Sequence, residues 1–164
     1  MSGFFAFCQW LQNTTFSVSI RESTWVFPII EATHVLALGF SVGIIVAIDL
    51  RLAGLAMRRE PALEVSGELL PLALGGFFVM FVTGVLLFCS MPLKAYESVF
   101  FTIKMVLLLL SGVNALVFHV TIYRSMAEWD NAAVPPLRAR VAGWLSLALW
   151  AGVIVAGRTM AYKF

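Results

Sequence analysis

Residues 69–93 read LLPLALGGFFVMFVTGVLLFCSMPL and contain no Asp, Glu, Lys or Arg. An α-helix needs about 20 mostly apolar residues to cross the hydrocarbon core of a bilayer, so this stretch alone predicts a membrane span. Three further stretches lack charged residues, at 32–48, 105–123 and 141–157. Each approaches the same length, which indicates four transmembrane helices.

The composition of the whole chain agrees with this interpretation. Hydrophobic residues make up 61% of the 164 residues and charged residues 12%, and the mean hydropathy is +0.94. A soluble domain is typically about half apolar and a quarter charged. The predicted class is therefore an all-α integral membrane protein. Its expected helices cover residues 26–50, 69–91, 100–123 and 139–162.

Short connections between these helices predict a four-transmembrane-helix up-down bundle in one membrane domain, residues 1–164. Ser23 and Thr24 are suited to cap the first helix, and Pro92 to end the second. Ser66 and Glu68 are expected to precede the second helix, with Pro71 in its first turn. Pro135 and Pro136 precede the fourth.

The N-terminal segment has an apolar run too short to span a bilayer and no basic region typical of a signal peptide. We expect an interfacial amphipathic segment, with Trp10 and Trp25 at headgroup level. The net charge of +2 gives no argument for binding nucleic acid.

Arginines concentrate in the first and third connections and predict the topology. They are Arg51, Arg58 and Arg59 in the first, and Arg124, Arg138 and Arg140 in the third. The positive-inside rule places both connections in the cytoplasm and both termini on the outer side. Cys8 and Cys89 then lie on the outer side, where they either form a disulfide or remain unpaired apolar side chains.

Ionisable residues within the apolar stretches are the candidates for a functional site, because a charge inside a membrane is costly and usually marks one. At 100° per residue, Glu31, His34, Ser41 and Asp49 share one stripe of the first helix. Lys104, Ser111 and His119 share a stripe of the third. We expect these stripes to face the bundle interior.

Gly39 and Gly43 form a GxxxG pair on the opposite face of the first helix. Such pairs allow helices to approach closely. The partner is either a neighbouring helix of the same chain, which we favour slightly, or a second copy or partner membrane subunit.

Glu31 and His34 give the spacing Glu-x-x-His, which di-iron carboxylate bundles use in two copies with further glutamates. Only one copy occurs here, so the pair is a weak metal site. The simpler interpretation is that Glu31 neutralises Lys104 or Arg158 inside the bundle.

The outer half of the bundle is suited to a planar macrocycle with carboxylate arms. His34 is the candidate axial ligand, with a methionine, Met80 or Met105, or nothing in the sixth position. Lys104 and Arg158 are candidates to hold the propionates. Gly76 is a candidate to give the ring room, or else only aids helix packing. A quinone head group is suited to the same polar set.

His119 is not expected to share an iron with His34. The two lie at depths that differ by about 15 Å at 1.5 Å per residue. Two axial histidines allow their Cα atoms to be roughly 13 Å apart. His119 therefore belongs to the cytoplasmic end, where it is expected to pair with Asp49 or to ligate a second group.

The stretches IIEATHVLALGFSVGIIVAIDLRLAGL and FFTIKMVLLLLSGVNALVFH resemble a broad class of small bacterial membrane proteins. Copper-resistance D proteins and the membrane protoporphyrinogen oxidase belong to this class. His34, Arg51 and Lys104 match the pattern, whereas the relatives' helix-3 histidine falls nearer Ala115 than His119. The resemblance implies a four-helix bundle that handles haem, porphyrin or copper in the bacterial inner membrane.

Our leading hypothesis is a haem-b-binding membrane redox protein that passes electrons between a quinol or porphyrin and a partner. The second hypothesis is transfer of copper or another metal through the bundle. The third is a structural anchor subunit of a larger membrane complex. No arrangement for hydrolysis and no phosphate-binding loop occurs in the sequence.

Overall fold

The computed structural model describes residues 3–130 and 134–162, and these ranges contain helices and the turns that connect them, with no strand. Four helices are long and apolar enough to cross a membrane. In chain order the elements are α1 (Gly3–Gln12), α2 (Thr15–Glu22), α3 (Val26–Leu52), α4 (Ala62–Ser90), α5 (Pro92–Glu97), α6 (Val99–Val117), η1 (Phe118–Ile122), η2 (Tyr123–Ser125), α7 (Met126–Trp129) and α8 (Leu137–Tyr162).

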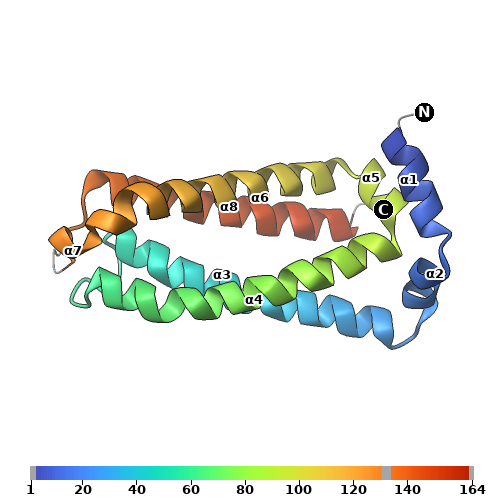
Figure 1. The fold of residues 1–164 in the computed structure, drawn as a ribbon, viewed down its shortest axis with the longest axis horizontal. Helices are drawn as coiled ribbons and strands as arrows, with labels where there is room; N and C mark the ends of the chain where they lie inside the picture. The colour runs from blue at the N-terminus through green and yellow to red at the C-terminus, as the bar shows by residue number, and fades with distance from the viewer. Residues whose placement is uncertain (1–2, 131–133, 163–164) are drawn as a thin grey trace.

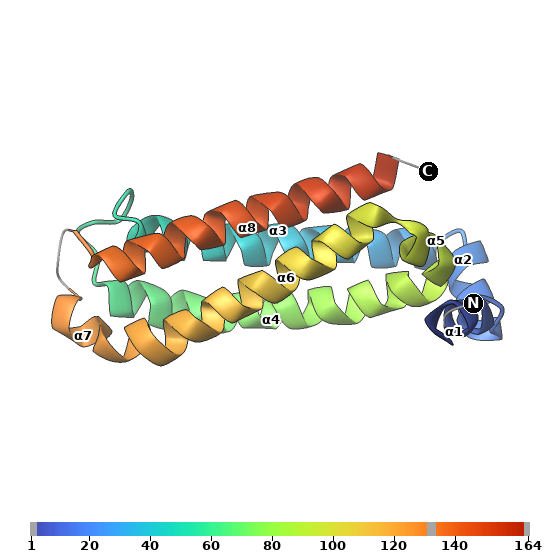
Figure 2. The same ribbon diagram turned by 90° about the horizontal axis from the view of Figure 1, so that it is seen from above.

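The long helices run antiparallel to their neighbours in the chain, as Figure 1 shows. Helix α3 packs along α4, α6 packs along α8, and contacts between α3 and α8 join the two pairs. Helices α4 and α6 are not among the closely packed pairs of the described chain. Figure 2 shows α6 running obliquely across the bundle. Consecutive helices are thus neighbours at the first and third connections but not at the second.

The two ends of the bundle differ. The terminal end carries α1, α2, α5 and the end of α8, whereas the arginine end carries residues 53–61, α7 and the start of α8 (Figure 1). Side chains of α2 form hydrogen bonds with the last turn of α4. The Ser17 hydroxyl donates to the Cys89 carbonyl at 2.7 Å, and Arg21 donates to the Ser90 carbonyl at 3.3 Å. These bonds satisfy carbonyls that a helix C-terminus leaves without partners.

Cys8 and Cys89 are both free thiols, and Cys8 is buried. The two cysteines therefore form no disulfide with each other in this structure and match the second alternative, unpaired apolar side chains. Trp10 and Trp25 are exposed beside the terminal end, where interfacial tryptophans are expected.

Helix α4 begins earlier than the sequence indicated. It starts at Ala62, so Ser66 and Glu68 lie inside the helix and Pro71 is an interior proline rather than a first-turn residue. The cap comes from a distant residue: an Asp130 carboxylate oxygen accepts from the Leu63 backbone N–H at 2.6 Å. A carboxylate at a helix N-terminus also interacts favourably with the helix dipole.

The buried side chain of Arg51 connects three segments at the arginine end of the bundle. Its side chain is 1% exposed. It donates to the Glu60 carbonyl at 2.9 Å and to the Asp130 carbonyl at 3.1 Å. The sequence analysis counted Arg51 as a charge in the first connection. In the structure, Arg51 joins the end of α3 to the segment before α4 and to the segment after α7.

A layer of large apolar side chains lies near the centre of the bundle. Val42 of α3 packs with Trp150 and Val153 of α8. Phe77 of α4 stacks on Trp150 with ring centroids 5.1 Å apart. Along α3, Val42 of this layer lies between His34, near the terminal end, and Asp49, near the arginine end.

Candidate functional site

The imidazole of His34 lies between α3 and α4 near the terminal end. Its Nδ1 atom is 3.0 Å from the Thr83 hydroxyl oxygen. That hydroxyl donates its own proton to the Val79 carbonyl, at 2.7 Å. A threonine has only one proton to donate, so we assign the proton of the His34 contact to Nδ1. Nε2 then keeps its lone pair for a ligand.

Helix α4 makes room for this ring at Gly84. A Cβ atom at Gly84 would lie 3.2 Å from Cε1 of His34, which is closer than most contacts of this kind. Thr83 and Gly84 are adjacent, so one residue orients the imidazole and the next gives it space. The sequence alone did not indicate the role of Gly84, because a glycine inside an apolar helix does not reveal which side chain of another helix it faces.

Lys104 approaches the same region from α6. Its side chain is half-buried and lies against Gly157 of α8, where a Cβ atom would be 3.8 Å from the ammonium nitrogen. Lys104 thus lies between α6 and α8, whereas the His34 imidazole lies between α3 and α4.

Arg158 and Glu31 do not join this pair. The Arg158 guanidinium donates to the Tyr162 hydroxyl and sits 4.6 Å from the centroid of the Tyr162 ring. Both Arg158 and Glu31 are exposed. The predicted placement of Arg158 beside Lys104 is therefore wrong, because a tyrosine one turn along α8 holds the arginine outside the bundle.

The proposed metal pair of Glu31 and His34 gains no further ligands. Among residues 3–130 and 134–162, no group of three His, Cys, Asp or Glu side chains is arranged to hold a metal ion. The two residues share a helix face, as their spacing predicted, but Glu31 is exposed whereas His34 is half-buried.

Met80 and Met105 lie in different places. Met80 is half-buried on α4, and its carbonyl oxygen lies 3.1 Å from the Thr83 hydroxyl oxygen. Met105 is exposed and lines a separate cleft of about 240 Å³ with Phe4 and Tyr96. Of the two predicted methionines, only Met80 is near His34.

Gly76 allows α3 and α4 to pack closely and does not make room for a macrocycle. A Cβ atom there would lie 2.1 Å from the hydroxyl oxygen of Ser41 and 3.1 Å from a ring carbon of Phe40. Helices α3 and α4 approach closely at this point, so no space for a macrocycle remains beside Gly76. The packing alternative is the one that the structure favours.

His119 lies in η1 and is exposed. Its ring stacks on Tyr123 with centroids 4.9 Å apart. Asp49 is buried on α3 and is hydrogen-bonded to Ser146 of α8. The expected pairing of His119 with Asp49 is therefore wrong, because η1 turns the histidine outward and α8 supplies the partner of Asp49.

Gly39 and Gly43 are exposed, and nothing in the described chain lies within 4 Å of a Cβ atom built at either glycine. The expectation that this face packs against a neighbouring helix of the same chain is wrong. The GxxxG face of α3 is open.

No family model, curated protein or solved structure matches the chain.

Proposed function

We propose that the four long helices cross a bilayer. Large apolar side chains cover their outer faces: Phe78 and Phe81 are each 69% exposed, and Leu109 is 68% exposed. Contiguous apolar surface of this kind is unfavourable in water and suited to lipid. Six of the eight arginines gather at one end, which supports a cytoplasmic arginine end and an outer terminal end in a bacterial inner membrane. Resistance of the membrane-bound chain to alkaline carbonate extraction tests the insertion.

We propose further that the site at His34 binds haem b and that the protein is a membrane redox protein. The observation that carries this proposal is the hydrogen bond between His34 and Thr83. Histidine ligands almost always donate their second ring N–H to a protein group, which fixes the tautomer and the ring orientation. The Thr83 hydroxyl, 3.0 Å from Nδ1 of His34, would be that group.

The residues present fit one axial histidine and one propionate partner. His34 would bind through Nε2, and the Lys104 ammonium would neutralise a carboxylate. Bound haem supplies one-electron chemistry. The protein's contribution is to orient the imidazole through Thr83 and to exclude water with the Phe77–Trp150 layer. His119 is outside the bundle, so it does not serve as the second ligand of this site.

The absorption spectrum of the purified protein tests this function. We expect a Soret band that is lost in His34→Ala and kept in His119→Ala, because His119 is an exposed histidine away from the site. A wild-type protein without the band, or an unchanged band in folded His34→Ala, would overturn the proposal. Elemental analysis of the same sample distinguishes haem iron from copper, and a quinone would be extracted without either metal.

The open GxxxG face supports an additional role in assembly. Gly39 and Gly43 offer a close-approach surface that the described chain does not use. We propose that a second copy or a partner membrane subunit packs there. An anchor subunit without a cofactor would show a stable partner after mild extraction and no Soret band.

A further inference from the structure

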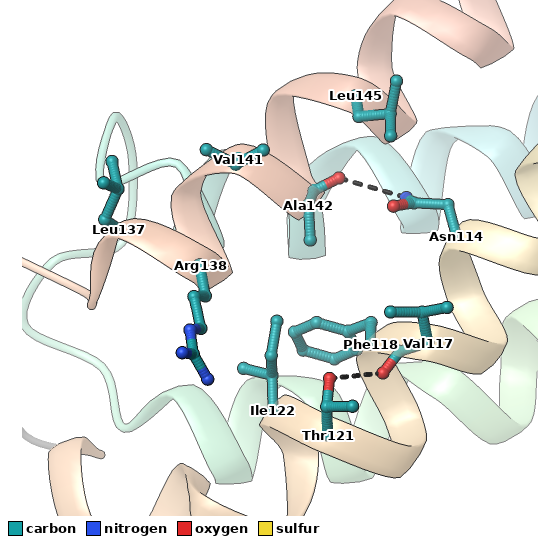
Figure 3. Close-up of a pocket in the computed structure, with 10 residues that line it drawn as sticks. All are labelled: Asn114, Val117, Phe118, Thr121, Ile122, Leu137, Arg138, Val141, Ala142 and Leu145. Atoms are coloured by element: carbon teal, nitrogen blue, oxygen red, sulfur yellow. Dashed lines mark hydrogen bonds between the residues drawn. The ribbon is translucent and has the colours of Figure 1, made fainter.

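A cleft of about 370 Å³ lies at the arginine end, between η1 and the first turns of α8. Figure 3 shows Phe118 and Ile122 on the η1 side and Val141 and Leu145 on the α8 side. Val141 and Leu145 are both largely exposed, so the cleft is accessible from the outside of the bundle. Its walls are suited to a hydrocarbon chain.

The π-helix shapes this cleft. In η1 the Tyr123 backbone N–H reaches back to the Phe118 carbonyl, which is a five-residue step. Such a step interrupts regular α-helical packing, and π-helical turns often occur at functional sites. Asn114 fixes the adjoining part of the wall, since its side-chain amide donates to the Ala142 carbonyl at 3.1 Å (Figure 3).

One cation lines the cleft. Arg138 is in the first turn of α8, is exposed, and extends from α8 toward η1 across the opening (Figure 3). The first turn of a membrane-spanning helix lies at headgroup depth, where a long cationic side chain meets lipid phosphate. The cleft therefore combines an apolar wall at the depth of lipid tails with a positive charge at the depth of headgroups.

We propose that this cleft binds an anionic phospholipid of the cytoplasmic leaflet. One acyl chain lies against Phe118, Ile122 and Val141, and a headgroup phosphate accepts hydrogen bonds from Arg138. Basic pockets between membrane helices on the cytoplasmic side are suited to anionic headgroups. The proposal rests on the membrane insertion and orientation proposed above, and it is independent of haem.

Native mass spectrometry of the detergent-purified chain tests the headgroup. The probes are phosphatidylglycerol and phosphatidylethanolamine with identical acyl chains. We expect the wild-type chain to retain phosphatidylglycerol preferentially, by about fivefold for one basic residue near the phosphate. Arg138→Gln should remove this preference. Arg59→Gln is the matched control, because Arg59 is exposed at the same end and does not line the cleft.

A second pair of variants tests the acyl-chain wall. Val141→Trp should fill the cleft and lower retention of both lipids. Val155→Trp places the same side chain on an exposed position of α8 away from the cleft and should leave retention unchanged.

Equal retention of the two lipids by the wild-type chain, an unchanged preference in Arg138→Gln, or full retention in Val141→Trp would each overturn the proposal. So would displacement of the lipid by inorganic phosphate alone. A chain that carbonate releases from membranes would instead show that the proposed membrane insertion has failed.

Discussion

The Nδ1 atom of His34 on α3 lies 3.0 Å from the hydroxyl oxygen of Thr83 on α4. Since that hydroxyl also donates to the Val79 carbonyl, the contact joins an imidazole, a hydroxyl and a backbone carbonyl in one chain of hydrogen bonds. The imidazole is thereby held in one orientation between two helices. This relationship makes His34, rather than His119, the histidine suited to bind a ligand.

Thr83→Val removes the hydroxyl while nearly keeping the volume of the side chain. We expect the free energy of unfolding to fall by about 1 kcal/mol, since one buried hydrogen bond is lost. We expect haem affinity to fall about tenfold or more, as when other orienting partners of metal ligands are removed. Thermal unfolding and haem titration measure the two effects.

Thr33→Val is the matched control for that variant. Thr33 is the residue before His34, and its hydroxyl donates only to the Ile29 carbonyl of the same helix. This substitution should therefore change haem affinity little. Equal effects of the two valine variants would show that the contact between His34 and Thr83 does not orient a ligand.

Gly76→Ala should strain the interface between α3 and α4. The new methyl group would meet the Ser41 hydroxyl, and Ser41 is fully buried. Overpacking of this kind costs about 1–3 kcal/mol. Gly75→Ala is the control, because nothing lies within 4 Å of a Cβ atom there and alanine favours a helix over glycine. Thermal unfolding in detergent compares the two variants.

A second substitution locates the strain. Ser41→Ala combined with Gly76→Ala removes the oxygen that the new methyl group would meet, so the double variant should be more stable than Gly76→Ala alone. If Ser41→Ala gives no such recovery, the close approach at Ser41 is not what limits the packing of α3 on α4.

The sequence was sufficient to predict the four long helices, because length and the absence of charge define them locally. The start of α4 was not predictable in the same way. Asp130, far along the chain, accepts hydrogen bonds from the backbone N–H groups of Ala62 and Leu63. No sequence pattern just before Ala62 indicates this contact. Pro71 was consequently assigned to a first turn that lies further upstream.

The partial burial of His34 and Lys104 was predictable, because helical angle decides which side of a helix faces its neighbours. Angle alone failed for Arg158 and His119, because each has an aromatic neighbour four residues along its own helix. Tyr162 holds Arg158 and Tyr123 stacks on His119. Gly76 was misassigned because its close neighbour, Ser41, belongs to another helix.

Arg51→Met should destabilise the arginine end of the bundle. The variant keeps much of the length of the side chain but loses the donors to the Glu60 and Asp130 carbonyls. Hydrogen bonds from a charged group contribute about 1.5–3 kcal/mol each, so we expect a loss of at least about 2 kcal/mol. Arg59→Met, at an exposed position, should change the unfolding midpoint little. Similar midpoints for both variants would contradict the role assigned to Arg51.

Gly43→Leu tests the open face of α3 because it separates folding from assembly. No atom of another described helix lies within 4 Å of a Cβ atom at Gly43, so the variant should keep the unfolding midpoint of the isolated chain. It should also lose the second copy or partner subunit, since a leucine prevents the close helix approach that glycines allow.

Gly143→Leu is the contrasting variant at a glycine that the fold uses. A Cβ atom at Gly143 would lie 2.9 Å from the Asp49 carbonyl oxygen, so this substitution should destabilise the contact between α3 and α8. Crosslinking in membranes and thermal unfolding in detergent measure assembly and stability on the same samples. A Gly43→Leu chain that assembles as the wild type does would show that the GxxxG face binds no partner. A Gly43→Leu chain that unfolds as readily as Gly143→Leu would show that this face is used within the chain itself.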